Sequence, residues 1–223
     1  MRDWILRRSP RGEFLLVTFV AFALFIVSSA VAVLRHDGRF EMTTAHLASG
    51  IVYEMTFLGI ACWILHLRGW NLARLGLEFS PGAALAGLPL MLAYLLLYWF
   101  TLLTIASFVP NAHLSDALQV RWLAPLPLTV TFLILNSVYE ELLVTGYVIT
   151  ALEHEGAAVA ITVSTLLRFS YHLYQGPVAA LTILPMGLLF GTVYWRSRSL
   201  WPLMVAHTLV NLFSVLASGH QRA

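Results

Sequence analysis

Seven polar residues interrupt apolar stretches of this sequence that are otherwise long enough to cross a lipid bilayer. They are Glu54, Glu140, Glu141, Arg168, His172, His207 and Asn211. A charge at the centre of a bilayer costs roughly 2.5–3.5 kcal/mol on insertion scales, so residues of this kind are functional candidates by default. The alternative is a structural ion pair that only fixes helix packing. That alternative suits Glu54, which stands alone in the first half of the chain, better than the group in the second half.

The spacing in the second half places polar residues on shared helix faces. His207 and Asn211 are four residues apart, and so are Arg168 and His172. On a helix, residues with this spacing lie on one face, one turn apart. We therefore expect the two members of each pair to point in the same direction.

The two adjacent carboxylates suggest a division of roles. Glu140 and Glu141 lie about 100° apart on a helix, so only one can point squarely at a common site and the other needs a second partner. A carboxylate beside a neutral histidine can hold and deprotonate a water molecule. A histidine and an amide on a neighbouring helix can donate hydrogen bonds to a developing oxyanion. This set favours peptide hydrolysis by an activated water, with no covalent intermediate.

Other hydrolytic chemistries fit the sequence less well. No serine lies in a strand–turn–helix elbow, and no cysteine lies near the histidines, which disfavours a nucleophile triad. His154-Glu155 is not followed by the second histidine of the zinc-protease motif. A zinc site from Glu140, His172 and His207 stays open, because two histidines and one carboxylate are a known catalytic ligand set. The favoured mechanism needs no cofactor.

The composition indicates a membrane protein. Of the 223 residues, 59% are hydrophobic and only 11% are Asp, Glu, Lys or Arg, against about 25% charged residues in ordinary soluble domains. A soluble globule cannot cover that much apolar side chain, and disordered chains are apolar-poor. The net charge of +2 comes from scattered arginines, which disfavours nucleic-acid binding. Cys62 is the only cysteine, so an internal disulfide is excluded.

The apolar runs predict an all-α, polytopic transmembrane helical bundle of about seven spans. They cover about residues 14–34, 46–67, 83–107, 126–151, 157–174, 178–195 and 200–217. The first three spans with their loops form an N-terminal part, residues 1–125, and the last four form a catalytic core, residues 126–217, within one membrane domain. Counting along the last spans places their polar groups in one central layer. A GxxxG step from Gly187 to Gly191 predicts close packing of the sixth span on a neighbour.

The arginines set the expected orientation. They are concentrated at the N-terminus and in the loops near residues 68–82 and 196–199, which places the N-terminus in the cytoplasm and, with seven spans, the C-terminus outside. The run Phe14–Leu34 is too long for a signal peptide and is read as a retained first span. All 13 basic residues are arginine. The absence of lysine suggests a bacterium with a GC-rich genome, and hence the bacterial cytoplasmic membrane.

Three motifs in the last spans resemble the CPBP family, also called the Abi or CAAX-protease family, of glutamic-type intramembrane endopeptidases. The family pattern is EExxxR, then FxxxH, then HxxxN, on successive membrane helices. Here it reads EELLVT from Glu140, RFSYH from Arg168 and HTLVN from His207. The resemblance covers about residues 126–215. It implies a membrane-embedded or lipid-anchored peptide or protein as substrate.

The resemblance also implies roles for the motif residues. Glu140 would be the general base and His172 would help to position the water. His207 and Asn211 would bind the oxyanion. Glu141 would orient the residues that contact the substrate without contacting it itself.

The sequence departs from the family pattern at two positions. The arginine of the first motif is replaced by Thr145, and the phenylalanine of the second by Arg168. Our hypothesis is that Arg168 supplies from the fifth span the positive charge that the fourth span lacks, pairing with Glu140 or Glu141. Glu54 is expected to be a further polar partner or the structural partner of Arg168. Alternatively, Thr145 marks an inactive member.

Two other functional classes remain open. One is a non-catalytic membrane scaffold or immunity protein with the same fold. The other is a small transporter or proton-relay protein that uses the buried carboxylates as relay sites. Transporters often consist of two related halves, and no such halves are visible in the sequence. Tyr171, next to His172, is expected to take part in interfacial aromatic packing.

Overall fold

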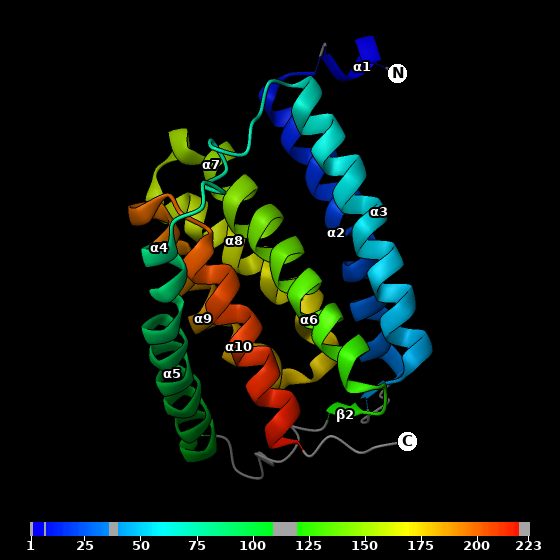
Figure 1. Ribbon diagram of the computed structural model, residues 1–223, viewed down its shortest axis with the longest axis vertical. Helices are drawn as coiled ribbons and strands as arrows, with labels where there is room; N and C mark the ends of the chain where they lie inside the picture. The colour runs from blue at the N-terminus through cyan, green and yellow to red at the C-terminus, as the bar shows by residue number, and fades with distance from the viewer. Residues whose placement is uncertain (1, 7, 36–39, 109–119, 219–223) are drawn as a thin grey trace.

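The computed structural model describes residues 2–6, 8–35, 40–108 and 120–218, and this part of the chain is almost entirely helical (Figure 1). The longer helices are α2 (Pro10–Arg35), α3 (Thr44–Leu67), α5 (Gly87–Phe108), α6 (Leu126–Glu140), α8 (Ala157–His172), α9 (Pro177–Ser197) and α10 (Trp201–Ala217). The shorter elements are α1 (Arg2–Leu6), α4 (Pro81–Leu85), a π-helical segment (Glu141–Tyr147), α7 (Val148–Ala151), two 3₁₀ turns (Glu153–Glu155 and Leu173–Gln175) and the strands β1 (Phe40–Met42) and β2 (Val120–Trp122).

The protein is an all-α membrane helical bundle, as expected from its apolar runs. In the described part of the chain, five helical segments are long and apolar enough to cross a membrane. They are Pro10–Leu34, Thr44–Leu67, Pro81–Phe108, Leu126–Ala151 and Val178–Ser197. α8 and α10 occupy the positions of the two remaining expected spans but have only 16 and 17 residues, fewer than the roughly 20 that a full crossing needs.

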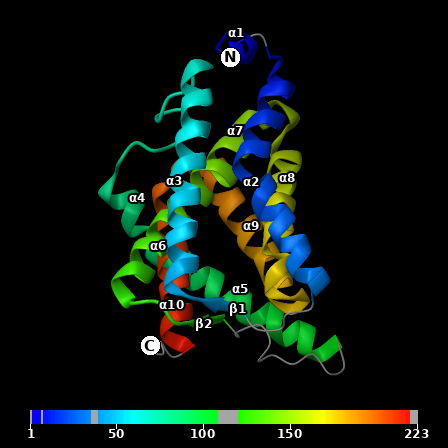
Figure 2. The ribbon, with the colours of Figure 1, turned by 90° about the vertical axis from the view of Figure 1, so that its right-hand side faces the viewer.

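One span lies at the centre of the bundle. The helix of residues 126–151, made of α6, the π segment and α7, has 72% of its most apolar window buried, against 22% in each of the first three spans. α3 and α10 pack against α6, and α8 packs against the π segment and α7 (Figures 1 and 2). Polar side chains on the central span therefore face other helices rather than lipid.

The outer helices present apolar side chains to their surroundings. Leu15 and Phe19 on α2, and Leu96 and Phe100 on α5, are each at least 66% exposed. Exposed residues of this size would be unusual on a soluble protein but match a surface covered by lipid tails. The protein is thus an integral membrane protein.

A short pair of strands was not predicted. β1 and β2 pair in parallel, with Phe40 opposite Val120 and Met42 opposite Trp122. The pair joins the start of α3 to the segment that leads into α6 (Figure 2). Strands of three residues carry no periodicity that a sequence pattern could reveal.

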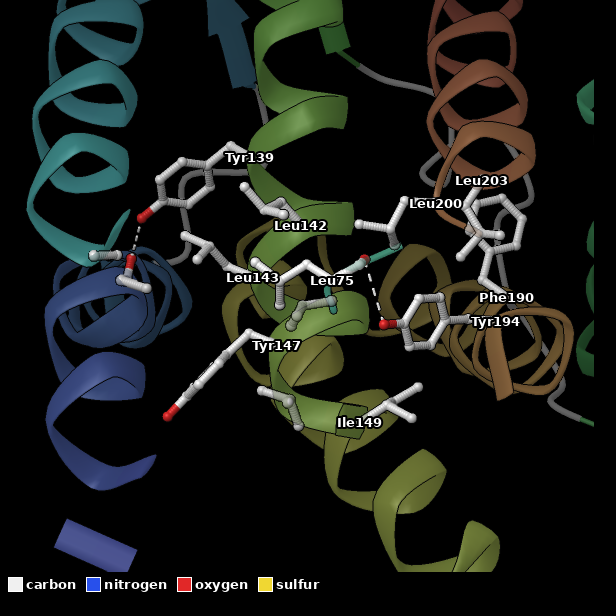
Figure 3. Close-up of a cluster of buried hydrophobic side chains, with 14 of the residues drawn as sticks. Leu75, Tyr139, Leu142, Leu143, Tyr147, Ile149, Phe190, Tyr194, Leu200 and Leu203 are labelled. Atoms are coloured by element: carbon white, nitrogen blue, oxygen red, sulfur yellow. Dashed lines mark hydrogen bonds between the residues drawn. The ribbon is translucent and has the colours of Figure 1, made fainter. Parts of the chain in front are cut away.

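Tyrosine hydroxyls attach the central span to its neighbours. Tyr139 donates a hydrogen bond of 2.6 Å to the carbonyl of Ala21 on α2. On the opposite side, the Tyr194 hydroxyl from α9 lies 2.8 Å from that of Thr150 and 3.4 Å from the carbonyl of Leu75 (Figure 3). Both rings are almost completely buried among leucines and isoleucines. The central span is therefore held by directional bonds as well as by packing.

The GxxxG step packs α9 closely on α8, as predicted. A Cβ atom on Gly187 would lie 2.8 Å from the Thr165 side chain and 3.0 Å from its Cα, and one on Gly191 would lie 2.9 Å from Ile161 Cγ2. Larger residues would push α8 away. This matters because α8 carries Arg168 and His172.

A buried ion pair ties α2 to the end of α3. The Nε atom of Arg68 donates to Glu13 Oε2 at 2.6 Å, and Trp70 Nε1 donates to Glu13 Oε1 at 2.8 Å. Arg68 Nη1 also donates to the carbonyl of Leu6 at 2.8 Å. We call the ion pair of Glu13 and Arg68, together with the hydrogen bond that Trp70 donates to it, the anchor pair.

Candidate functional site

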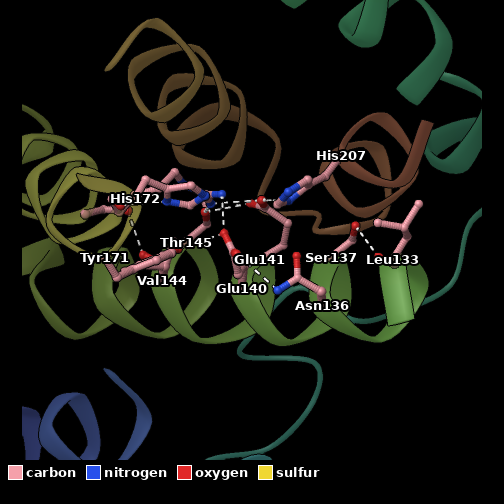
Figure 4. A network of polar contacts seen from close by, with 12 residues as sticks. Leu133, Asn136, Ser137, Glu140, Glu141, Val144, Thr145, Tyr171, His172 and His207 are labelled. Carbon is pink, nitrogen blue, oxygen red and sulfur yellow. Dashed lines mark hydrogen bonds and ion pairs between the residues drawn. The ribbon is translucent and has the colours of Figure 1, made fainter. Parts of the chain in front are cut away.

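Glu140 and Glu141 lie in the middle of the central span, at the point where α6 passes into the π segment (Figure 4). Both side chains are buried: Glu140 is 7% exposed and Glu141 is not exposed. π-helical turns inside α-helices are rare and occur frequently at functional sites. The irregular backbone thus begins at the paired carboxylates.

Arg168 bridges both carboxylates from α8. Its Nη1 atom donates to Glu140 Oε2 at 3.1 Å and its Nη2 atom to Glu141 Oε1 at 2.8 Å. Nη2 also donates to the hydroxyl of Thr145 at 3.0 Å, and this hydroxyl donates to Glu141 Oε2 at 2.8 Å. The guanidinium thus lies against the side chain that replaces the family arginine, the arrangement that our hypothesis of an exchanged charge requires.

The two histidines enter the same network from different helices. His207 on α10 places Nδ1 2.7 Å from Glu141 Oε1. His172 on α8 places Nδ1 2.8 Å from the carbonyl of Arg168. A carbonyl can only accept, so His172 Nδ1 carries a proton, and in the neutral ring Nε2 keeps its lone pair. We name Glu140, Glu141, Arg168, His172 and His207 the central cluster.

Asn211 and Glu54 lie at the edge of the central cluster. Asn211 is partly buried one turn beyond His207 on α10, and no hydrogen bond from the described residues reaches its side chain. Glu54 on α3 is buried and accepts a hydrogen bond of 2.8 Å from Asn136 Nδ2. Among the described contacts it does not pair with Arg168, so that part of the expectation for Glu54 is wrong. The two Nη atoms of Arg168 instead bond the two carboxylates that follow one another on the central span, and its buried Nε atom has no hydrogen-bond partner among the described residues.

Two residues of the network were missed or misjudged from the sequence. Asn136 donates through Nδ2 to Glu140 Oε1 at 3.2 Å as well as to Glu54. It lies four residues before Glu140, and the i, i+4 rule could have found it. Tyr171 stacks on Phe22, in keeping with the expected packing, but its hydroxyl also donates to Glu140 Oε2 at 2.7 Å.

Neighbouring side chains satisfy backbone groups of the π segment. The hydroxyl of Ser164 on α8 donates to the carbonyl of Val144 at 2.6 Å, and that of Tyr194 lies 3.3 Å from the carbonyl of Gly146. A Cβ atom on Gly146 would lie 2.9 Å from Leu200 Cδ1. The π segment is therefore supported by α8 and α9 and by the start of α10, so it is built into the packing.

The central cluster has hydrogen-bonding capacity left for a ligand. Within the described part of the chain, the Nε2 atoms of His172 and His207 have no recorded partner, while both Nδ1 atoms are engaged. In the same part, no three His, Cys, Asp or Glu side chains form a group that could hold a metal ion. The zinc ligand set Glu140, His172 and His207 is therefore not assembled as such. The arrangement is suited to hold a polar molecule between a carboxylate and two imidazoles.

Comparison with known proteins identifies one family. Residues 122–213 match the family model described as type II CAAX prenyl endopeptidase Rce1-like. The comparisons with curated proteins and with solved structures gave no match. The matched segment runs from β2 to α10 and contains the whole central cluster and Asn211, whereas Glu54 lies outside it. The segment that builds the site, residues 122–213, is thus similar to the Rce1-like type II CAAX prenyl endopeptidases, in keeping with the CPBP family that its three motifs resemble.

Proposed function

We propose that this protein is an intramembrane endopeptidase of the glutamic type, which hydrolyses a peptide bond of a membrane-embedded or lipid-anchored substrate. The observation that carries the proposal is the central cluster itself. Two carboxylates, one arginine and two histidines from three helices meet in the buried middle of the bundle. A cluster that costs this much to place in a membrane needs a function to explain it.

Glu140 acts as the general base. It accepts hydrogen bonds from Arg168 and Tyr171, which fix the direction of its carboxylate. His172 presents the lone pair of Nε2, because its Nδ1 proton is held by the carbonyl of Arg168. A water molecule bound between these two acceptors would give one proton to Glu140 and attack the peptide carbonyl carbon. Glu140 would then return the proton to the leaving amine.

His207 and Asn211 stabilise the oxyanion. Glu141 holds His207 through Nδ1, which fixes the orientation of the ring. When Nε2 carries a proton, its N–H is a donor for the negative oxygen of the tetrahedral intermediate. The Asn211 amide, one turn along α10, can add a second donor once the substrate is bound. Glu141 therefore acts through His207 and not on the substrate.

We also propose that the N-terminus is cytoplasmic and that the membrane is the bacterial cytoplasmic membrane. Arg68, Arg74 and Arg198 lie at one end of the bundle, because the Arg68 loop bonds to the start of α2 and Leu200 N donates to the Gly76 carbonyl at 2.9 Å. Their clustering at one end supports the assignment of that end to the cytoplasm.

Cleavage of a quenched transmembrane peptide panel by the purified protein tests the proposal. Glu140→Gln should lower kcat by about 10²–10⁴-fold, the usual contribution of a general base. Glu153→Gln, which alters an exposed surface pair with Arg198, is the matched control and should keep activity. Cleavage that persists in chelator supports the glutamic mechanism, whereas loss in chelator favours zinc. Equal cleavage by the wild type and Glu140→Gln contradicts the proposal.

A further inference from the structure

We propose that Asn136 and Glu54 are a positioning pair that selects Oε1 of Glu140 as the atom that removes the proton from water. This inference rests on the proposed function and deepens it. Asn136 belongs to α6, and Glu54 belongs to α3, which precedes the family-matched segment. The N-terminal half of the chain thus contributes to the site.

The two oxygens of Glu140 differ in the bonds that they already accept. Oε2 accepts from Arg168 Nη1 at 3.1 Å and from the Tyr171 hydroxyl at 2.7 Å. A carboxylate oxygen offers about two lone pairs, so Oε2 is filled. Among the described contacts, Oε1 accepts only from Asn136 Nδ2, at 3.2 Å. One lone pair of Oε1 therefore remains for a water molecule.

Glu141 does not offer the same opportunity. Its Oε1 atom accepts from Arg168 and lies against His207 Nδ1, and its Oε2 atom accepts from Thr145. Its side chain has no exposed surface, whereas Glu140 keeps 7% exposure. By the same count Oε2 of Glu141 also keeps one lone pair, so exposure favours Glu140 over Glu141, and the unfilled lone pair favours Oε1 of Glu140 as the atom that meets water.

Glu54 fixes the direction of the Asn136 amide. Both partners of Asn136 Nδ2 are carboxylate oxygens, which only accept while ionised, so the NH₂ group divides its two protons between them. Without Glu54, the amide could rotate and present its own oxygen to Glu140. The carboxylate on α3 thus acts on Glu140 through Asn136.

The burial of Glu54 also favours a role of this kind. Its side chain is 2% exposed and its Oε2 atom, fully buried, has no hydrogen-bond partner in the described part of the chain. A buried carboxylate with an unfilled oxygen stabilises a fold poorly. Its one recorded hydrogen bond joins it to the amide beside the proposed base.

Kinetics on the cleaved peptide test the positioning pair. Asn136→Ala and Glu54→Ala should each lower kcat by up to about 10²-fold with KM nearly unchanged, because misplaced catalytic groups cost rate rather than binding. Glu54→Gln, which keeps an acceptor for Asn136, should retain more kcat than Glu54→Ala. In the double variant Glu54→Ala/Asn136→Ala, the second change should add nothing, since Glu54 acts through Asn136. Additive losses, or wild-type kcat in both single variants, would overturn the inference.

Infrared spectroscopy provides a readout independent of cleavage. The difference spectrum between each protein and the same protein with Glu140→Gln isolates the carboxylate stretch of Glu140. Asn136→Ala and Glu54→Ala should shift this band. Two controls should leave it in place: Asn71→Ala, which alters a loop asparagine, and Thr56→Ala, which alters a hydroxyl of α3 bonded to the carbonyl of Val52. An unshifted band, with Glu140→Gln inactive, overturns the positioning pair and leaves the proposed function standing, whereas equal cleavage by wild type and Glu140→Gln overturns the proposed function and the inference with it.

Discussion

Two buried carboxylate–arginine groups in this protein have similar chemistry and different surroundings. In the anchor pair, each carboxylate oxygen of Glu13 accepts one bond, from Arg68 or from Trp70, and Arg68 also bonds a backbone carbonyl. This group lies at the end of the bundle, where α2 begins and α3 ends. Its partners all belong to the helix ends and the loop that it connects, so its effect is to hold these helix ends together.

The central cluster differs in depth and in the ring nitrogens that its histidines leave unpaired among the described residues. Arg168 serves two carboxylates at once, and both histidines keep an Nε2 atom without a recorded partner in the described chain. Buried ion pairs are weak evidence for stability, because desolvation offsets much of the attraction. The contrast shows that a buried pair alone does not indicate a site. The histidine nitrogens in the middle of the bundle, unpaired within the described residues, are what support the proposed site.

The largest effect is expected from removing the shared cation. Arg168→Met leaves two buried carboxylates without their charge partner, and breaking a buried pair in this way costs about 3–5 kcal/mol of unfolding free energy. Thermal unfolding in detergent, with peptide cleavage on the folded fraction, measures the loss. A variant as stable as the wild type would show that Arg168 is no more essential than an ordinary surface charge.

A smaller net effect is expected when the charge is moved back to the central span. Arg168→Phe alone should lose stability and cleavage, and Thr145→Arg added to it should recover part of both, because position 145 already contacts Arg168 and Glu141. Unfolding and cleavage of the single and double variants measure the recovery. If the double variant is inactive and unfolded while Arg168→Phe alone is active, the exchange of charges is wrong.

The anchor pair should give the smallest effect and a different kind of effect. Glu13→Gln keeps the shape and one acceptor but weakens the bonds from Arg68 and Trp70, which should cost about 1–3 kcal/mol of stability. Cleavage per folded molecule should stay unchanged, since the hydrogen bonds of Glu13 go to Arg68 and Trp70 and to no residue of the central cluster. A fall in kcat without a fall in stability would contradict the interpretation that the anchor pair acts on stability and the central cluster on catalysis.

Much of the fold and part of the site follow from the sequence, for identifiable reasons. Hydropathy predicts the helices because a bilayer imposes length and apolarity, and the cost of buried charge picks out Glu140 and Arg168. Asn136 was missed because it carries no charge and lies outside the three family motifs. Tyr171 was assigned to packing because an aromatic ring gives no sign of where its hydroxyl points. Pairing of Glu54 with Arg168 could not be tested from spacing, since it depends on how α3 sits against α6.

The π segment constrains how many residues the central span has between α6 and α7. Its wider turns separate the face presented by α6, which carries Asn136 and Glu140, from the face presented by α7, which packs on α8. Deleting one residue between 141 and 147 would return the span to α-helical phase and turn everything after it by about 100°. The Thr150 hydroxyl would then move away from that of Tyr194, whereas Asn136, which precedes the deletion, would keep its position. The number of residues in this segment is therefore constrained as well as their identity. We expect single-residue deletions here to be tolerated less well than most substitutions.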